Sequence, residues 1–143
     1  GRKLNNSMGN YFANKFFNFL KRQKIFKRKK KILILGLAFK ENCNDIRNSK
    51  VFDIIKNLSK NFYINVYDPH VNKKDVNFSK GIRLITKIKK YQYDGIIIAV
   101  KHDAFKTLGF KKIISFGNKN SLIYDIKNIF IDSKNPILKN DII

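Results

Sequence analysis

The sequence predicts an α/β fold, namely a doubly wound, mostly parallel, Rossmann-like sheet that is preceded by one helix. Two observations lead to this prediction. Short apolar runs rich in isoleucine and valine alternate with segments whose apolar residues recur every three or four positions. The connections between these runs are long enough for right-handed crossovers, which join parallel strands.

The N-terminal segment has the pattern of an amphipathic helix. Its apolar residues recur at spacings of three and four and form one face: Leu4, Met8, Tyr11, Phe12, Phe16, Phe19 and Leu20. Residues 23–30 are mostly basic and lack this pattern, so we expect a linker there. We therefore place a domain boundary near Lys30, which divides the chain into residues 1–30 and residues 31–143.

The remainder of the chain is expected to alternate strands with helices. We expect strands at residues 31–37, 62–67, 82–85, 94–100 and 122–126, and helices at residues 49–59 and 110–116. The first strand is apolar without alternation, which is typical of a strand buried on both faces. Asp68 and Pro69 end the second strand, since proline donates no ladder hydrogen bond and aspartate favours turns. Gly117 is expected to end the last helix in the left-handed conformation.

Length and composition limit the class of protein. A chain of 143 residues fits one domain and can bury an apolar core without disulfides. One cysteine cannot form an internal disulfide. No apolar run approaches the roughly twenty residues of a membrane span, and residues 1–20 lack the uninterrupted apolar centre of a signal peptide. We therefore expect a cytoplasmic protein. Because the sequence starts at Gly1 and not at methionine, we also expect it to be part of a longer protein.

The charge of the chain favours a second hypothesis. With 31 Lys and Arg against 10 Asp and Glu, the formal net charge is +21, a balance typical of nucleic-acid-binding proteins. Lys, Asn, Ile and Phe are all abundant, however, as adenine- and thymine-rich coding would produce. No helix-turn-helix, zinc-finger or RNA-recognition motif supports the charge. A stand-alone basic nucleic-acid-binding module stays the alternative.

The loop after the first strand carries two cations, Lys40 and Arg47. A strand, a basic loop and a helix N-terminus in sequence is how α/β sheets present a site for anionic nucleotides. Lys40 offers a point charge and Arg47 a planar fork for phosphate oxygens. Asn48 or Ser49 can cap the helix, and we expect backbone N–H groups of the loop to face an anion. The other interpretation is that both cations are solvated loop charges.

Four ordered blocks in this chain carry a family resemblance. Residues 36–55, 66–71, 96–105 and 123–130 resemble the C-terminal nucleotide-binding domain of the UDP-glucose/GDP-mannose dehydrogenase family. They are most similar to the enzymes that oxidise UDP-N-acetylglucosamine or UDP-N-acetylgalactosamine. The first thirteen residues resemble the end of the family's central helical domain, with Asn6 in place of an aspartate. Asn44 stands where the family usually has proline.

The resemblance implies roles for four residues. Phe39 and Lys40 match a Phe-Lys pair that contacts the nucleotide sugar, and Lys127 matches a basic residue that also contacts it. Arg47 matches an arginine that reaches NAD, which the family binds mainly through its N-terminal domain. Since Lys40 and Lys127 both follow strands, we expect them to converge on one diphosphate-sized hollow at one edge of the sheet.

The resemblance also implies an activity for the whole protein. It is the NAD-dependent oxidation of a UDP-N-acetylhexosamine to its uronic acid, for surface polysaccharide. The family's catalytic cysteine precedes the part present here, so we expect no catalytic residue in this chain and no activity from the chain alone. Residues 4–20 are a candidate contact face for a homodimer or a larger homo-oligomer.

Two further hypotheses are weaker. A phospho-accepting signalling domain would need clustered acids directly after the first strand, and these are missing. The chain could also be the remnant of a degraded dehydrogenase gene.

Other polar residues are expected to have minor roles. Cys43 has no catalytic base placed beside it, so we expect a passive loop thiol. His70 and His102 lack metal-ligand spacing, and we expect His102 and Asp103 to cap the turn after the central strand. Asp125 is expected to orient the loop that carries Lys127. The GxGxxG dinucleotide fingerprint is absent, so we expect this sheet to bind the UDP moiety and not NAD.

Overall fold

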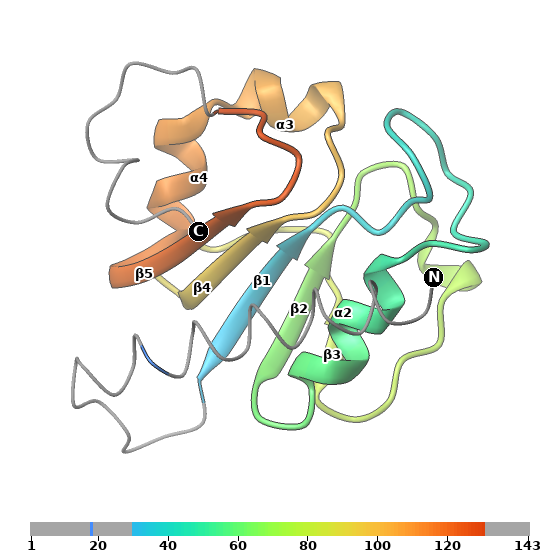
Figure 1. Cartoon of the computed structure of the whole chain (residues 1–143), viewed down its shortest axis with the longest axis horizontal. Coiled ribbons are helices and arrows are strands. Elements are labelled where there is room, and N and C mark those ends of the chain that lie inside the picture. Colours follow the sequence, from blue (N-terminus) through green and yellow to red (C-terminus); the bar gives the residue numbers. More distant parts are fainter. Residues whose placement is uncertain (1–17, 19–29, 131–143) are drawn as a thin grey trace.

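Five parallel strands form the centre of the fold, in the order β3-β2-β1-β4-β5 (Figure 1). The computed structural model describes Asn18 and residues 30–130. Its elements are β1 (Lys31–Leu35), α2 (Val51–Leu58), β2 (Tyr63–Tyr67), the short 3₁₀ helix η1 (Lys73–Asp75), β3 (Ile82–Leu84), β4 (Tyr93–Ile98), α3 (Asp103–Leu108), α4 (Phe110–Phe116) and β5 (Gly117–Asp125). The predicted α/β fold with a parallel, doubly wound sheet is confirmed.

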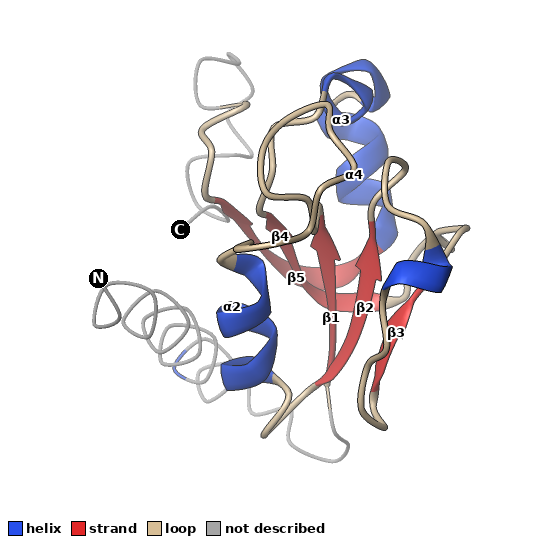
Figure 2. Cartoon of the chain, turned by 90° about the vertical axis from the view of Figure 1, so that its right-hand side faces the viewer, coloured by secondary structure: helices blue, strands red, loops and turns tan. Residues whose placement is uncertain are grey.

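Two apolar layers cover the two faces of the sheet. Ile32 and Ile34 of β1 belong to the layer that includes α2, whereas Leu33 and Leu35 belong to the layer that includes α3 and α4. Figure 2 shows α2 on one face of the sheet and α3 and α4 on the other. All four β1 side chains are completely buried, as the continuous apolar run predicts for a central parallel strand.

Helix α2 is held to the sheet by one apolar stripe. Val51, Ile54, Ile55 and Leu58 are buried, and their spacing places them on a single helical face. Each such side chain contributes roughly 1.5–3 kcal/mol when it is fully buried. The N-cap residue of α2 is Lys50, not Asn48 or Ser49 as predicted, and its side chain makes no capping hydrogen bond. Ser49 lies one residue earlier, and its Oγ atom accepts a hydrogen bond of 3.3 Å from the Val51 N–H.

The strand order creates one switch point, where the chain changes direction across the sheet. β1 lies between β2 and β4, and the chain runs outward from β1 to β3 before it returns to the other side of β1 at β4. The loops that follow β1 and β4 therefore leave the sheet towards opposite faces. Ligands of open α/β sheets bind in the crevice that such a divergence leaves at the carboxyl ends of the strands.

Gly36 ends β1 two residues earlier than predicted. Its φ of +102° suits glycine, and a Cβ atom built there would lie 2.5 Å from the Cβ of Val100. The Gly36 N–H donates to the carbonyl of Tyr67 at 2.8 Å, after which the chain turns out of the ladder. The close approach of the loops after β1 and β4 therefore depends on a missing side chain.

Two further expectations differ from the structure. Gly117 has a φ of −81° and is the first residue of β5, so the predicted left-handed end of α4 is wrong. The glycine next to this helix that has a positive φ is Gly109, at +82°, which lies between α3 and α4. Helix α3 was not predicted, because six residues are too few to show helical periodicity.

The predictions for the N-terminal segment concern other parts of the chain. The helix expected at residues 4–20, its dimer face and the linker at residues 23–30 lie outside the described residues, apart from Asn18 and Lys30. The domain boundary near Lys30 stays a prediction.

Candidate functional site

A hollow of about 300 Å³ lies at the switch point between β1 and β4. Three loops that follow β1, β4 and β5 contribute to it, together with the first turn of α2. Its lining residues are Ala38, Phe39, Lys40, Glu41, Ser49, Lys50, Val51, Ala99, Val100, Lys101 and Lys127. The volume is at the lower end of the range typical of small-ligand sites.

The charged side chains around this hollow are mostly basic. Lys40, Lys50, Lys101 and Lys127 line it, and Glu41 is the acid among its lining residues. Several like charges around a concave surface raise the local concentration of ions of opposite charge. The predicted convergence of Lys40 and Lys127 on one hollow is confirmed, and their role in binding stays a prediction.

Phe39 lines the same hollow with a largely exposed ring. Its exposed fraction is 55%, although the neighbouring Leu37 and Ala38 are buried. Exposure of a large aromatic ring costs solvation free energy unless a ligand or another surface covers it. An aromatic face beside several cations suits a ligand with both a planar or apolar part and an anionic part.

Arg47 lies apart from the other three predicted site residues. It lines a different, open hollow together with Asn44, Asp45, Ile46 and Asp75. Its side chain is 86% exposed and makes a two-pronged contact with Asp45, whose Oδ1 and Oδ2 atoms each accept at 3.0 Å. The side-chain hydrogen bond from Arg47 lowers the pKa of Asp45. The structure therefore does not bring Arg47 to the lysine hollow.

The backbone of the loop after β1 is tied into the protein. The N–H groups of Leu37 and Ala38 both donate to Oδ2 of Asp68, at 2.7 and 2.9 Å. The Phe39 N–H donates to the carbonyl of Asp45 at 2.6 Å. The expectation that backbone N–H groups of this loop face a bound anion is wrong for these three residues, whose N–H groups are bonded within the protein.

Asp68 is the acceptor around which this loop is organised. Burial alone would raise the pKa of Asp68, but hydrogen bonds from His102 and from the N–H groups of Leu37, Ala38 and His70 together outweigh burial and lower this pKa. Asp68 was predicted only to end a strand. Its position at the end of β2 is where dinucleotide-binding sheets place the acid that binds ribose. Here the carboxylate is buried and is engaged by the loop after β1 and by His102, so it is not free to bind a ribose.

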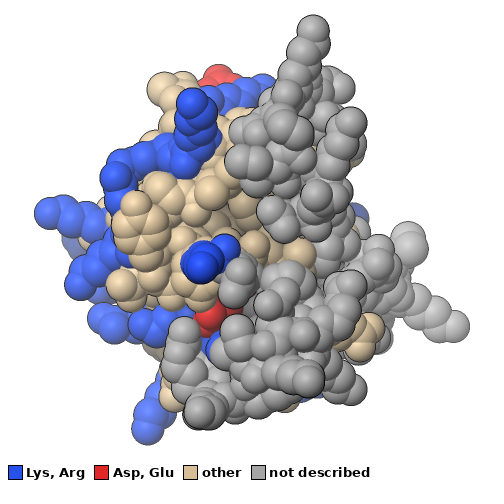
Figure 3. Space-filling view, turned by 90° about the vertical axis from the view of Figure 1, so that its left-hand side faces the viewer, with Lys and Arg blue, Asp and Glu red and all other residues tan. Residues whose placement is uncertain are grey.

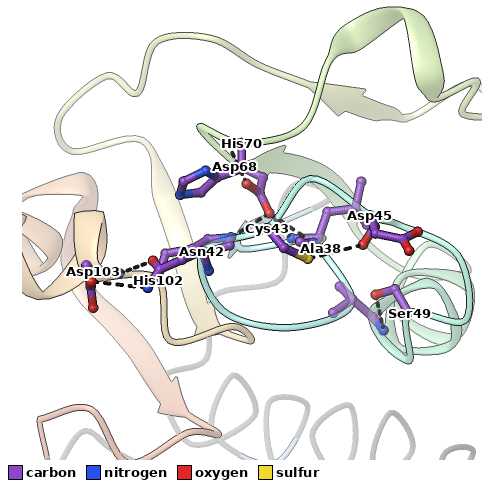
Figure 4. Close-up of polar contacts among 11 residues, drawn as sticks. Ala38, Asn42, Cys43, Asp45, Ser49, Asp68, His70, His102 and Asp103 are labelled. Atoms are coloured by element: carbon purple, nitrogen blue, oxygen red, sulfur yellow. Dashed lines mark hydrogen bonds and ion pairs between the residues drawn. The ribbon is translucent and has the colours of Figure 1, made fainter.

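His102 completes this buried cluster. Its Nε2 atom lies 2.9 Å from Oδ2 of Asp68, and both side chains have an exposed fraction of 0%. Its Nδ1 atom accepts a hydrogen bond of 2.8 Å from the N–H of Asn42 (Figure 4). His102 does occupy the N-cap position of α3, but its side chain makes no capping hydrogen bond there, so the predicted capping role is wrong for the imidazole.

The loop after β5 is shaped by Asp125, as predicted. Oδ1 of Asp125 accepts from the Ile129 N–H at 3.0 Å, and Oδ2 accepts from the Phe130 N–H at 2.8 Å. These bonds stabilise the turn that includes Lys127. The carboxylate is buried and lies at the base of the loop, which leaves the exposed Lys127 at the rim of the hollow.

The described residues form neither a membrane-spanning helix nor a metal-binding cluster. None of their helices is long and apolar enough to cross a membrane. No group of three or more His, Cys, Asp or Glu side chains within the described ranges is arranged to hold a metal ion. Cys43 is half-buried, and its Sγ atom lies 3.9 Å from the carbonyl oxygen of Asp45.

Known proteins resemble this chain over most of its length. Residues 33–132 match the family model described as the UDP binding domain of the UDP-glucose/GDP-mannose dehydrogenase family. The chain is 38% identical over 130 residues to a UDP-N-acetyl-D-glucosamine 6-dehydrogenase of Salmonella typhi, covering 90% of this chain and 31% of that protein. It is 36% identical over 138 residues to a UDP-N-acetyl-D-glucosamine 6-dehydrogenase of Pseudomonas aeruginosa, covering 96% of this chain and 33% of that protein. The chain thus spans about a third of the length of these relatives.

A solved structure has the same arrangement of elements. The UDP-D-ManNAc dehydrogenase from Pyrococcus horikoshii superposes with a TM-score of 0.65 at 26% sequence identity, over 90% of this chain and 29% of that chain.

Proposed function

The chain belongs to the UDP-glucose/GDP-mannose dehydrogenase family, and we propose that it is the substrate-binding C-terminal part of an NAD-dependent UDP-N-acetylhexosamine dehydrogenase. The complete enzyme would oxidise the primary alcohol of the sugar to a carboxylate, which supplies a uronic acid for surface polysaccharide. The observation that carries this proposal is the hollow at the switch point, where four lysines from three loops surround a space of about 300 Å³.

The pyrophosphate of a UDP-sugar matches the charge of this hollow. Lys40 and Lys127 approach it from the loops after β1 and β5, so together they can neutralise the two negative charges of a pyrophosphate diester. Phe39 would pack against the nucleotide or the sugar. The names of the two relatives described above favour an N-acetylated sugar over glucose.

The contribution of this chain to the reaction would be orientation. Binding the nucleotide rigidly places the sugar at a fixed point, which lowers the entropic part of the barrier for groups supplied by the rest of the enzyme. NAD supplies the oxidising power in such a reaction, and we propose that it is held outside this sheet. Arg47 is exposed on the loop after β1, so it is available to reach a dinucleotide held by another domain.

Isothermal titration calorimetry with UDP-N-acetylglucosamine tests the proposal. We expect the chain to bind it, and we expect Lys40→Ala and Lys127→Ala each to weaken binding about tenfold, the effect of losing one charge-assisted contact. Lys111→Ala is the matched control, because it removes one exposed lysine from α4, away from the hollow. Absence of binding by the unaltered chain, or an equal loss in all three variants, would refute the assignment.

The net charge of +21 supports the second candidate, a nucleic-acid-binding module. Figure 3 shows basic side chains spread around the described part of one face, with uncharged surface between them. A duplex oligonucleotide titrated in parallel separates the two hypotheses. Tight duplex binding that weakens steeply with salt, without any response to the nucleotide sugar, would favour the module.

Assembly and location complete the proposal. We infer that the enzyme works in the cytoplasm, where its nucleotide substrates are made, and that it forms a homodimer or a larger homo-oligomer through residues 4–20. Light scattering of the chain with and without residues 1–30 tests the second inference. A mass equal to one chain in both samples would contradict it.

A further inference from the structure

The loop that carries Lys40 is anchored through Asn42 to the two residues at the start of α3, His102 and Asp103. The Asn42 N–H donates to Nδ1 of His102 at 2.8 Å. The Asn42 side chain accepts from the Asp103 N–H at 2.9 Å and donates to Oδ2 of Asp103 at 3.1 Å. Asn42 itself has a φ of +57°, a conformation that these contacts must hold. Lys40 is two residues away, so its position depends on this anchor.

These contacts determine which nitrogen of the His102 ring donates and which accepts. A backbone N–H can only donate, so the Nδ1 atom that faces Asn42 must be an unprotonated acceptor. The proton of the neutral ring is therefore on Nε2, from which it is donated to Oδ2 of Asp68 at 2.9 Å. Both side chains are fully buried, so water does not replace either partner.

We propose that His102 is a positioning residue for nucleotide-sugar binding, which holds the loop bearing Lys40 through the hydrogen bond at its Nδ1 atom. This proposal rests on the proposed function, since it concerns the same hollow. The imidazole links Asp68 at the end of β2 to Asn42 in the loop after β1.

The surroundings of His102 hold its ring in place. The Asp68 carboxylate accepts the Nε2 proton at 2.9 Å. The ring of His70 lies 4.5 Å from that of His102, between centroids, and the apolar ring of Phe105 on α3 packs at 5.3 Å. Asp103 is engaged by the Asn42 side chain.

Among the described residues, the Asn42 N–H is the only group in hydrogen-bond contact with Nδ1 of His102. Loss of this acceptor is therefore expected to shift the loop away from the conformation that lines the hollow.

Two substitutions separate the two bonds of the imidazole. In His102→Asn, the amide oxygen takes the place of Nδ1 and keeps an acceptor for Asn42, while the bond to Asp68 is lost. In His102→Gln, the amide nitrogen takes the place of Nε2 and keeps the bond to Asp68, while the acceptor for Asn42 is lost. His70→Gln is the matched control, because it removes the exposed imidazole beside His102.

The experiment follows the Asn42 amide by nitrogen-15 NMR hydrogen exchange and the binding of UDP-N-acetylglucosamine by calorimetry. His102→Gln should exchange the Asn42 amide about tenfold faster and bind the ligand about tenfold more weakly, because the fraction of molecules with a held loop falls. His102→Asn keeps the acceptor for Asn42, so it should stay close to the unaltered chain in both measurements, as should His70→Gln.

Several results would overturn the proposal. They are equal losses in the His102→Gln and His102→Asn variants, unchanged Asn42 exchange in His102→Gln, or a loss in His70→Gln as large as that in His102→Gln. Fast exchange of the Asn42 amide in the unaltered chain would also overturn it, and this measurement decides the matter even if a variant fails to fold. If the unaltered chain binds no nucleotide sugar, the proposed function fails, and Asn42 exchange alone then judges the hold of His102 on the loop.

Discussion

Replacing Asp68 by alanine is expected to destabilise the fold strongly. The carboxylate accepts four hydrogen bonds: at Oδ2 from the Leu37 N–H, the Ala38 N–H and Nε2 of His102, and at Oδ1 from the His70 N–H. His70 is exposed, so water can replace its lost partner. The other three donors are buried and would be left without an acceptor.

The magnitude follows from those three donors. An unsatisfied buried donor costs about 1–3 kcal/mol, and the loop after β1 can relax to recover part of this. We therefore expect Asp68→Ala to lower the free energy of unfolding by about 3–5 kcal/mol, a large share of the roughly 5–15 kcal/mol typical of a domain.

Urea unfolding measured by far-ultraviolet circular dichroism is the appropriate assay, because the chain has no tryptophan for fluorescence. Asp75→Ala is the matched control, since Asp75 is an exposed aspartate in η1. A loss below about 1 kcal/mol in Asp68→Ala, or a loss equal to that of Asp75→Ala, would refute the reasoning about buried donors.

The pH dependence gives a second check on Asp68. Its pKa in the folded chain is lowered from the ordinary value of 3.8, so the unfolded chain binds the proton more tightly. The stabilisation is therefore fully present above about pH 5 and is lost as the pH falls below 3.8 through the lowered folded pKa. In Asp68→Ala this component of the acid-induced loss of stability should be missing.

Three further predictions concern other parts of the fold. Gly36→Ala should lower the free energy of unfolding by about 2–4 kcal/mol, because its φ is unfavourable for alanine and its Cβ atom would meet Val100. Gly81→Ala should lower the free energy of unfolding by only about 1 kcal/mol, because its φ is also unfavourable but the space around it is open. Similar losses in the two glycine variants would argue against a close approach at Gly36. Burial raises the pKa of Tyr93 more than the hydrogen bond from Asn65 lowers it, so Tyr93 should ionise above its ordinary pKa of 10.0. Its contribution to the free energy of unfolding should be complete below pH 10.0 and should be lost as the pH rises further. Ultraviolet titration of tyrosinate in the unaltered chain and in Tyr93→Phe measures this. The expectation would be contradicted if the substitution removed a tyrosine that ionises below pH 10.0. Arg47→Ala should leave the urea midpoint unchanged, because its pair with Asp45 is exposed and screened, and a clear shift of the midpoint would show that this pair is structural.

The sequence alone determined the strands and the placement of two binding candidates. The apolar runs of β1 and β4 identify buried parallel strands, because a strand that is buried on both faces needs consecutive apolar residues, which are visible in the sequence itself. Lys40 and Lys127 could be placed in one hollow from topology, since carboxyl ends of parallel strands share an edge. The turn formed by Asp125 was predictable for a similar reason, as its partners follow within five residues.

Only the tertiary structure decided what Asp68 and His102 do. They are 34 positions apart, and Asp68 meets the loop after β1 because β1 and β2 are neighbours in the sheet. In sequence, an aspartate before a proline is equally typical of an ordinary turn, and a histidine after a strand is equally typical of a helix cap. The direction of Arg47, away from the hollow, likewise depends on the path of its loop. Local patterns specify which segments form elements, whereas the partner of a polar side chain at a strand end depends on which strands become adjacent.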